Sequence, residues 1–180
     1  WKPEWDHFPW RENEDELNIW KRGLNGQPIV DAGMREMYVT GRMHNRVRMI
    51  VASYLTKHLL IDWRHGLKWF EDCLIDWDPA SNAMGWQWVA GSGPDASPFF
   101  RVFNPELQAK KFDPDGKYQM KFLGLTFKPT TESEKFCKMA PKSWNIHEKS
   151  RPSTSIVDLK FGRDRALNTY SEFKKIISDI

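Results

Sequence analysis

Residues 28–59 decide the fold, and they read PIVDAGMREMYVTGRMHNRVRMIVASYLTKHL. Pro28 suits the first turn of a helix, and apolar side chains follow it at helical spacing as far as Gly41. A second apolar set with the period of an amphipathic helix comprises Val47, Ile50, Val51, Tyr54, Leu55 and Leu59. The stretch therefore predicts two consecutive helices.

The rest of the chain continues in the same way. Asp78-Pro79 and Asn104-Pro105 each resemble an N-cap followed by proline at the first helical position. A closing helix is expected from about Phe161 to Ile177, and no alternating strand pattern of useful length is present. The predicted fold class is all-α. We expect residues 1–123 to form its core, and residues 124–180 to add a surface segment, extended to about Ser155, and the closing helix.

Composition narrows the class of protein. The chain has 180 residues, of which 40% are hydrophobic and 28% charged, as in a globular domain. No apolar run approaches the roughly 20 residues of a membrane span, so no membrane partner is expected. Cys73 and Cys137 stand far apart, which argues against a disulfide framework and predicts a cytoplasmic protein. Because the sequence opens on Trp1 without a methionine, we expect it to be part of a longer chain.

The sequence lacks the motifs of several common kinds of active site. The sequence has no HExxH, no CxxC and only scattered histidines, so no metal site is expected. It has no glycine-rich phosphate loop and no G-x-S-x-G nucleophile. Basic residues outnumber acidic ones between Arg35 and Lys68, which indicates either a phosphate-facing surface or a solvated helix face.

Tryptophan is abundant, with ten in the chain. Trp86 and Trp88 lie two apart on a predicted helix and should point to opposite sides, one into a buried pocket and the other toward an outer cavity. Such rings suit electron transfer or base stacking, but they also suit a packed core. Asp76 and Asp78 lie near them, with Arg48 as a candidate partner. The acids either line a polar pocket for a heterocycle or act as a surface acid and an N-cap.

Four motifs then identify a resemblance: MHNRVRMIVAS, LLIDWR, GWQWVAG and RVFNP. In this order and spacing they resemble the C-terminal flavin-binding domain of the DNA photolyase and cryptochrome family, over about residues 10 to 120. VDLKFGRDRALNTY, at 157–170, resembles the family's closing helix, whereas residues 125–156 depart from its pattern. The resemblance implies a helical domain that binds FAD. It also implies that the first part of this domain and the antenna domain, with its folate or deazaflavin chromophore, belong to the full-length parent.

The resemblance also implies roles for single residues. The positions that match flavin contacts are Asn45, Arg48, Asp76, Asp78 and Asn82. Asn82 matches the residue that faces flavin N5, where photolyases favour Asn and plant-type cryptochromes Asp. The family's electron-hopping triad, which reduces resting flavin, matches Trp86, Trp63 and Trp10. The positions that match contacts with DNA or a flipped dimer are Asn45, Arg46, Met49 and Trp88. Arg42 departs from the aromatic residue that many relatives carry beside the flavin.

The implied function is light-driven repair of cyclobutane pyrimidine dimers in DNA, in which excited reduced FAD lends an electron to the flipped-out dimer. Such a protein would be a monomeric, FAD-dependent lyase that acts on DNA in a bacterial-type cytoplasm. The first alternative is a cryptochrome-type blue-light photoreceptor without repair activity. The second is a helical nucleic-acid-binding or interaction domain that has lost its cofactor.

Overall fold

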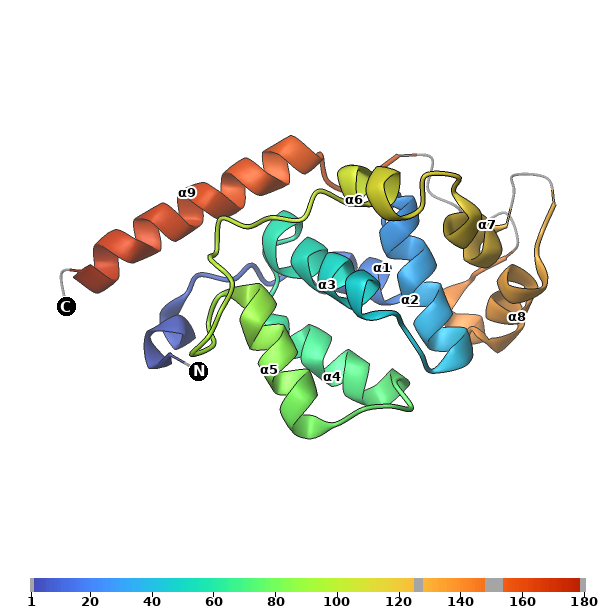
Figure 1. Cartoon of the computed structure of the whole chain (residues 1–180), viewed down its shortest axis with the longest axis horizontal. Helices are drawn as coiled ribbons and strands as arrows, with labels where there is room; N and C mark the ends of the chain where they lie inside the picture. The colour runs from blue at the N-terminus through green and yellow to red at the C-terminus, as the bar shows by residue number, and fades with distance from the viewer. Residues whose placement is uncertain (1, 125–127, 148–153, 179–180) are drawn as a thin grey trace.

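The computed structural model describes residues 2–124, 128–147 and 154–178, which form a helical assembly (Figure 1). The bounds are η1 Pro3–His7, α1 Glu14–Lys21, α2 Pro28–Thr40, α3 Asn45–Ser53, η2 Tyr54–His58, α4 Trp63–Cys73, α5 Pro79–Ala90, α6 Pro105–Phe112, α7 Lys117–Leu123, α8 Thr131–Met139, η3 Lys142–Trp144 and α9 Leu159–Ser178. An isolated β-bridge joins Arg11 and Ile61, and no β-sheet forms among the described residues. The predicted all-α class is confirmed. None of the described helices combines the length and apolarity needed to cross a bilayer.

The two helices predicted from residues 28–59 form where expected. Helix α2 begins at Pro28 and ends at Thr40, and it is capped by Gly41, whose φ of 68° is a left-handed conformation that suits glycine. Helix α3 is capped by the His44 side chain, which accepts a hydrogen bond from the Arg46 amide. At Tyr54 it passes into the π-helical turn η2. The predicted second helix is therefore confirmed, with a wider last turn.

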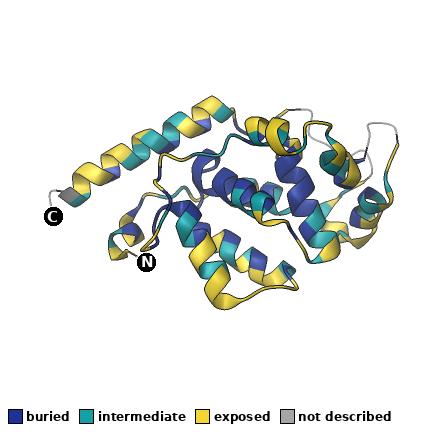
Figure 2. Ribbon diagram, viewed as in Figure 1, coloured by how far each residue is buried: buried dark blue, intermediate teal, exposed yellow. Residues whose placement is uncertain are grey.

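One large core joins α1 to α5, and a smaller one joins the N-terminal segment to α9. The buried faces of α2 and α3 form the centre of the large core (Figure 2). Trp20 anchors α1 there by donating its indole N–H to the Val51 carbonyl at 3.2 Å. The small core contains Trp5, Phe8, Leu60, Phe99, Ala166 and Phe173. Helix α9 packs onto this core through Ala166 and Phe173, and it begins two residues before the expected Phe161.

The expected extended segment is wrong for residues 131–139, which form α8. Thr130 and Ser133 cap this helix reciprocally, and Phe136 on its inner face is 1% exposed. The Arg35 guanidinium lies 4.8 Å from the Phe136 ring centroid and so links α8 to α2. The polar composition of this segment gave no helical pattern of apolar residues, because α8 is held by a single buried aromatic ring. Residues 125–127 and 148–153 of the expected segment lie outside the described ranges.

The basic stretch from Arg35 to Lys68 is not one charged surface. Arg35 is buried and donates through Nε to the Gly23 carbonyl. Lys57 is fully buried, and its Nζ donates to the Ala90 carbonyl at 2.9 Å and lies 3.2 Å from the Phe99 ring centroid. Burial lowers the pKa of Lys57 well below its usual range. These two side chains serve packing rather than phosphate binding.

Candidate functional site

A cavity of about 420 Å³ opens between α3, α4 and α5. This volume lies within the range of small-molecule sites. Eight of the residues singled out in the sequence line it: Asn45, Arg48, Met49, Asp76, Asp78, Asn82, Trp86 and Trp88. The fold therefore gathers these residues from helices α3 and α5 and from the loop before α5, and Phe70 of α4 completes the lining.

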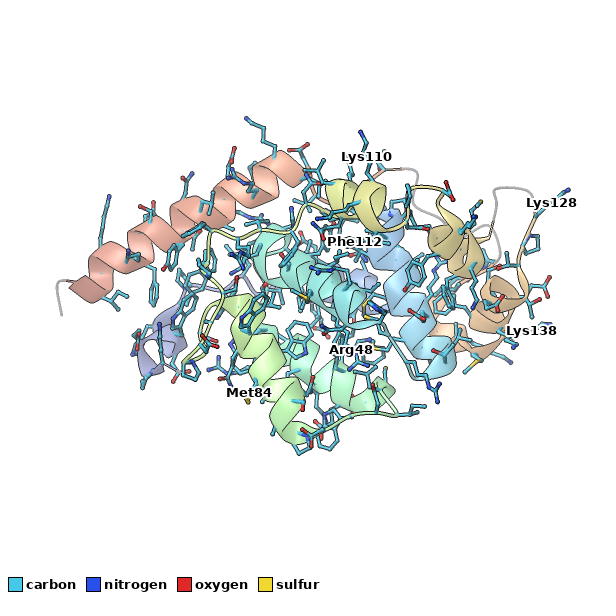
Figure 3. The ribbon with its side chains drawn as sticks, viewed as in Figure 1. Arg48, Met84, Lys110, Phe112, Lys128 and Lys138 are labelled. Atoms are coloured by element: carbon cyan, nitrogen blue, oxygen red, sulfur yellow. The ribbon has the colours of Figure 1, made fainter. Side chains whose placement is uncertain are left out.

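Arg48 and Asp76 form one part of the cavity rim. Arg48 Nη2 lies 2.9 and 2.7 Å from the two Asp76 carboxylate oxygens, and Arg48 Nε donates to the Met43 carbonyl at 2.7 Å. The candidate partnership between these two residues is thus confirmed. In Figure 3, Arg48 lies between α3 and the α4–α5 pair. The pair connects α3 to the loop that precedes α5.

The N-terminal end of α5 supplies two further polar groups. Asp78 caps the helix by accepting a hydrogen bond from the Ser81 amide at 2.7 Å, and this bond holds the pKa of Asp78 below its usual range. Asp78 also lines the cavity, so it is both an N-cap and a pocket-lining acid. Asn82 lies one turn further on and donates through Nδ2 to the Leu67 carbonyl of α4 at 3.0 Å. This bond fixes the amide in the cavity wall.

Trp86 and Trp88 line the same cavity, so the expectation of two separate cavities is wrong. An indole is long enough to reach a common space from either side of a helix. Trp86 is 2% exposed and makes edge contacts with Phe70 and Trp20, at centroid distances of 4.9 and 6.2 Å. Its Nε1 is buried without a hydrogen-bond partner. An orphaned donor of this kind is rare and fits a site for a ligand acceptor or a redox role.

The cavity suits a flat heterocycle with a polar edge. Its lining combines carboxylate, guanidinium and amide groups with large aromatic and aliphatic side chains. At Gly85 the space reaches the helix backbone, since an added Cβ would meet nothing within 4 Å. Sequence reasoning missed Gly85 and Ser81, although both follow Asp78 and Asn82 at helical spacing. It also missed Phe70, for which the sequence carries no signal.

Four other residues singled out in the sequence lie outside this cavity. Trp63 is buried in the large core with Trp86, and Trp10 packs against both cores. The Arg46 guanidinium lies 4.7 Å from the ring centroid of Phe112, which ends α6. Arg42 is exposed and lines a neighbouring hollow that it shares with Arg48 and Asp76.

Comparison with known proteins gives one consistent family. Residues 1–172 match the family described as the FAD binding domain of DNA photolyase, a longer match than the motifs at 10–120 predicted. The chain is 52% identical to a deoxyribodipyrimidine photo-lyase of Agrobacterium fabrum, over 97% of this chain and 37% of the relative. It is 44% identical to that of Salmonella typhimurium, over 92% of this chain and 35% of the relative. The chain thus spans little more than a third of these relatives.

Solved structures agree with this assignment. The fold resembles a class III photolyase from Agrobacterium tumefaciens, with a TM-score of 0.81 and 51% identity over 97% of this chain and 37% of that one. For an archaeal photolyase from Sulfolobus tokodaii, solved with two FAD molecules, the TM-score is 0.77 and the identity is 37%, over 94% of this chain and 37% of that one. For a Synechocystis cryptochrome, the TM-score is 0.74 and the identity is 36%, over 91% of this chain and 34% of that one. The chain belongs to the family of the FAD-binding domain of DNA photolyase.

Proposed function

We propose that the native protein carrying this chain binds FAD in the cavity between α3, α4 and α5 and repairs cyclobutane pyrimidine dimers in DNA under blue light. The observation that carries the proposal is the meeting of Asn82, Trp86 and Trp88 in one cavity. An amide and two indoles there combine a hydrogen-bonding site for a flavin edge with a stacking surface for an extruded base.

The residues divide by chemistry. Arg48, Asp76, Asp78, Asn82 and Asn45 would hold the polar edges of the cofactor and substrate. FAD, when bound and reduced, supplies a light-absorbing one-electron donor, whereas the protein supplies binding and orientation. The indole of Trp86 lies against the site, and we assign Trp63 and Trp10 to the same electron relay.

The DNA side of the site follows from the remaining residues. Trp88 and Met49 give an apolar surface on which a flipped-out dimer can pack, because an enzyme that acts on a base must take it out of the stack. Arg46 adds a cation for the phosphate backbone. We propose that this activity resides in a cytoplasmic monomer.

A photoreceptor function is the second candidate, because a cryptochrome shares the fold at 36% identity. Asn82 and Trp88 favour repair, since the family resemblance associates Asn82 and Trp88 with photolyases, whereas plant-type cryptochromes carry Asp and tend to carry Tyr at these two positions. The two functions differ in whether the protein selects and converts dimer-containing DNA.

The test uses the native protein that carries this chain, its flavin content from the absorption spectrum, and an oligonucleotide with one cyclobutane thymine dimer. We expect dimer loss under blue light. We also expect Trp88→Ala to weaken binding of the dimer by about 1–3 kcal/mol, the usual contribution of a stacked base. Trp144→Phe, which lies outside the cavity, is the control. Bound flavin with intact dimers and no lesion-specific binding would favour the photoreceptor, and absence of flavin would overturn both functions.

A further inference from the structure

The phenyl ring of Phe112 holds two cations at the end of α6. The Arg46 guanidinium of α3 lies 4.7 Å from the ring centroid, and the Lys111 ammonium lies 5.3 Å from it. Both distances fall within the range of about 6 Å over which the face of an aromatic ring attracts a cation. Figure 3 places Phe112 between α6 and α3, and the residue is 46% exposed. Contact with the two cations therefore accounts for the position of this ring better than burial does.

The backbone on both sides of α6 is braced, so the ring stands on a fixed frame. The Asp113 carboxylate, directly after Phe112, accepts a hydrogen bond from the Tyr118 amide at 3.0 Å and so ties the end of α6 to α7. Before α6, the Phe103 amide donates to the Ser53 hydroxyl at 3.1 Å, and Ser53 is the last residue of α3. Helix α6 is thus tied to the helix that carries Arg46. A side chain on such a frame suits the orientation of a partner group.

Two arginines on α3 are held in different ways. The Arg48 guanidinium pairs with the Asp76 carboxylate at 2.7 Å, which neutralises its charge. Arg46 lies on the phenyl ring instead, and it forms no ion pair with an acid within residues 2–124, 128–147 and 154–178. A ring face holds a guanidinium without neutralising it and leaves the N–H donors at the edge of the guanidinium plane available. Phe112 therefore suits a cation whose anionic partner comes from outside the chain.

The position of Arg46 on α3 indicates which anion this is. Arg46 follows Asn45 and lies one helical turn before Met49, and both of these neighbours line the cavity. Arg46 is half-buried and Lys111 is exposed, so both can be reached from solvent. A nucleotide whose base enters the cavity brings its backbone phosphate to this edge of α3.

We propose that Phe112 is a positioning residue that presents Arg46, together with Lys111, to a DNA backbone phosphate at the mouth of the cavity. The ring acts through the two cations and touches neither the flavin nor the dimer. It orders the long Arg46 side chain before DNA arrives, which lowers the entropy lost on binding. The inference rests on the proposed function, which assigns Arg46 to the phosphate backbone.

The first experiment measures the affinity of the native protein that carries this chain for an oligonucleotide with one cyclobutane thymine dimer, at several salt concentrations. Phe112→Leu keeps an apolar side chain but removes the ring face. We expect affinity to fall about two- to fivefold, the usual strength of an exposed cation–π contact. The salt dependence should become shallower, because a phosphate contact is weakened. Phe112→Tyr keeps the ring face and should restore both, and thermal melting curves establish that each variant is folded.

A double-mutant cycle with Arg46→Gln tests whether the ring acts through this cation. Arg46→Gln alone should lower the slope of log affinity against log salt by about 0.9, the value for one phosphate contact on duplex DNA. In the Phe112→Leu background the same change should cost less affinity, because the contact is already weakened. The loss in Phe112→Leu should raise KM and leave the repair rate at saturating DNA unchanged, since the ring touches neither flavin nor dimer.

Phe161 on α9 provides the matched control. It is 60% exposed, and the Arg165 guanidinium lies 5.3 Å from its ring centroid, but it does not line the cavity. Phe161→Leu removes a comparable cation–π contact and should leave the affinity and its salt dependence unchanged. A loss as large as that in Phe112→Leu would overturn the local role of Phe112.

The second experiment repeats the salt titration with an undamaged oligonucleotide, which requires neither flavin nor light. Dimer repair with the same affinity and salt dependence in Phe112→Leu as in the wild type overturns the inference and leaves the proposed function standing. Equal losses in Phe112→Leu and Phe112→Tyr, or additive losses in the double variant, also overturn the inference alone. Intact dimers, with a loss of affinity for undamaged DNA that Phe112→Tyr restores, overturn repair and leave the positioning role standing. Absence of DNA binding overturns both.

Discussion

The Arg48 guanidinium on α3 holds the Asp76 carboxylate of the α4–α5 loop through two hydrogen bonds, at 2.9 and 2.7 Å. The Asp76 side chain is 55% exposed and that of Arg48 27%, so the pair stands at the rim of the cavity rather than in the core. A pair in this position contributes little to stability but fixes the direction of a cation at a binding site.

Replacement of Asp76 tests this role. Asp76→Asn should lower the free energy of unfolding by less than about 1 kcal/mol, as for other exposed pairs. It should weaken FAD binding by about tenfold, equivalent to about 1.4 kcal/mol, because Arg48 loses its anchor beside the ligand. Flavin fluorescence titration measures the affinity. Lys68→Gln breaks an exposed pair with Glu71 on α4 outside the cavity and should leave the affinity unchanged. An unaltered affinity in Asp76→Asn would refute the role.

Gly66 gives α4 its contact with Trp86. A Cβ at this position would lie 2.1 Å from the Trp86 Cη2 atom, so the indole must move. We expect Gly66→Ala to lower the free energy of unfolding by about 1–3 kcal/mol, the usual cost of overpacking. Urea denaturation measures it. Stability equal to the wild type would mean that the Trp86 ring shifts freely.

Gly85 on α5 provides a comparison with Gly66, because an alanine at position 85 should raise the free energy of unfolding rather than lower it. An added Cβ meets nothing within 4 Å, so Gly85→Ala should gain about 0.5–1 kcal/mol from helix propensity. The same methyl group projects into the cavity, so FAD affinity should fall while stability rises. The comparison with Gly66→Ala separates packing from ligand binding. A stabilised variant with full affinity would place the cofactor away from Gly85.

Asn82→Asp changes one atom of the cavity wall from a donor to an acceptor. The Asn82 Nδ2 donates to the Leu67 carbonyl at 3.0 Å, and a carboxylate cannot replace that bond unless it is protonated. We expect Asn82→Asp to lower the free energy of unfolding by about 1–3 kcal/mol at neutral pH. The effect should diminish at acidic pH, because the carboxyl group then takes up a proton. Denaturation at two pH values measures it. A loss that stays constant with pH would show that Leu67 is not the cause.

His58 predicts an acid sensitivity of the fold. Burial, helped by the Arg165 guanidinium, lowers the pKa of His58 from 6.5 to about 4. Between these values the unfolded chain binds more protons than the folded one, so stability falls as pH falls from 6.5 to 4. The total contribution is about 3 kcal/mol. His58→Gln should remove this part of the pH dependence. His65→Gln, on an exposed part of α4, is the control, and equal slopes in wild type and His58→Gln would contradict the prediction.

The sequence by itself determined helices α2, α3, α5, α6 and α9, because their signals are local, whereas it did not reveal α8. The end of α2 at Gly41 and the caps of α5 and α6 at Asp78 and Asn104 depend on residues within one turn. The stripe of α9 depends on the helical period alone. The motifs also selected eight of the residues that line the cavity, because the resemblance to the family assigned roles to those positions.

The tertiary structure decided which of those residues meet and what surrounds them. Only packing shows that Trp86 and Trp88 share one cavity, and that Lys57 is buried against Phe99. Only packing brings Trp5 between Trp10 and Tyr170, which are far apart in the chain. The physical reason is that caps and helical periods act over a few residues, whereas burial and ring stacking depend on distant segments that the sequence does not order in space.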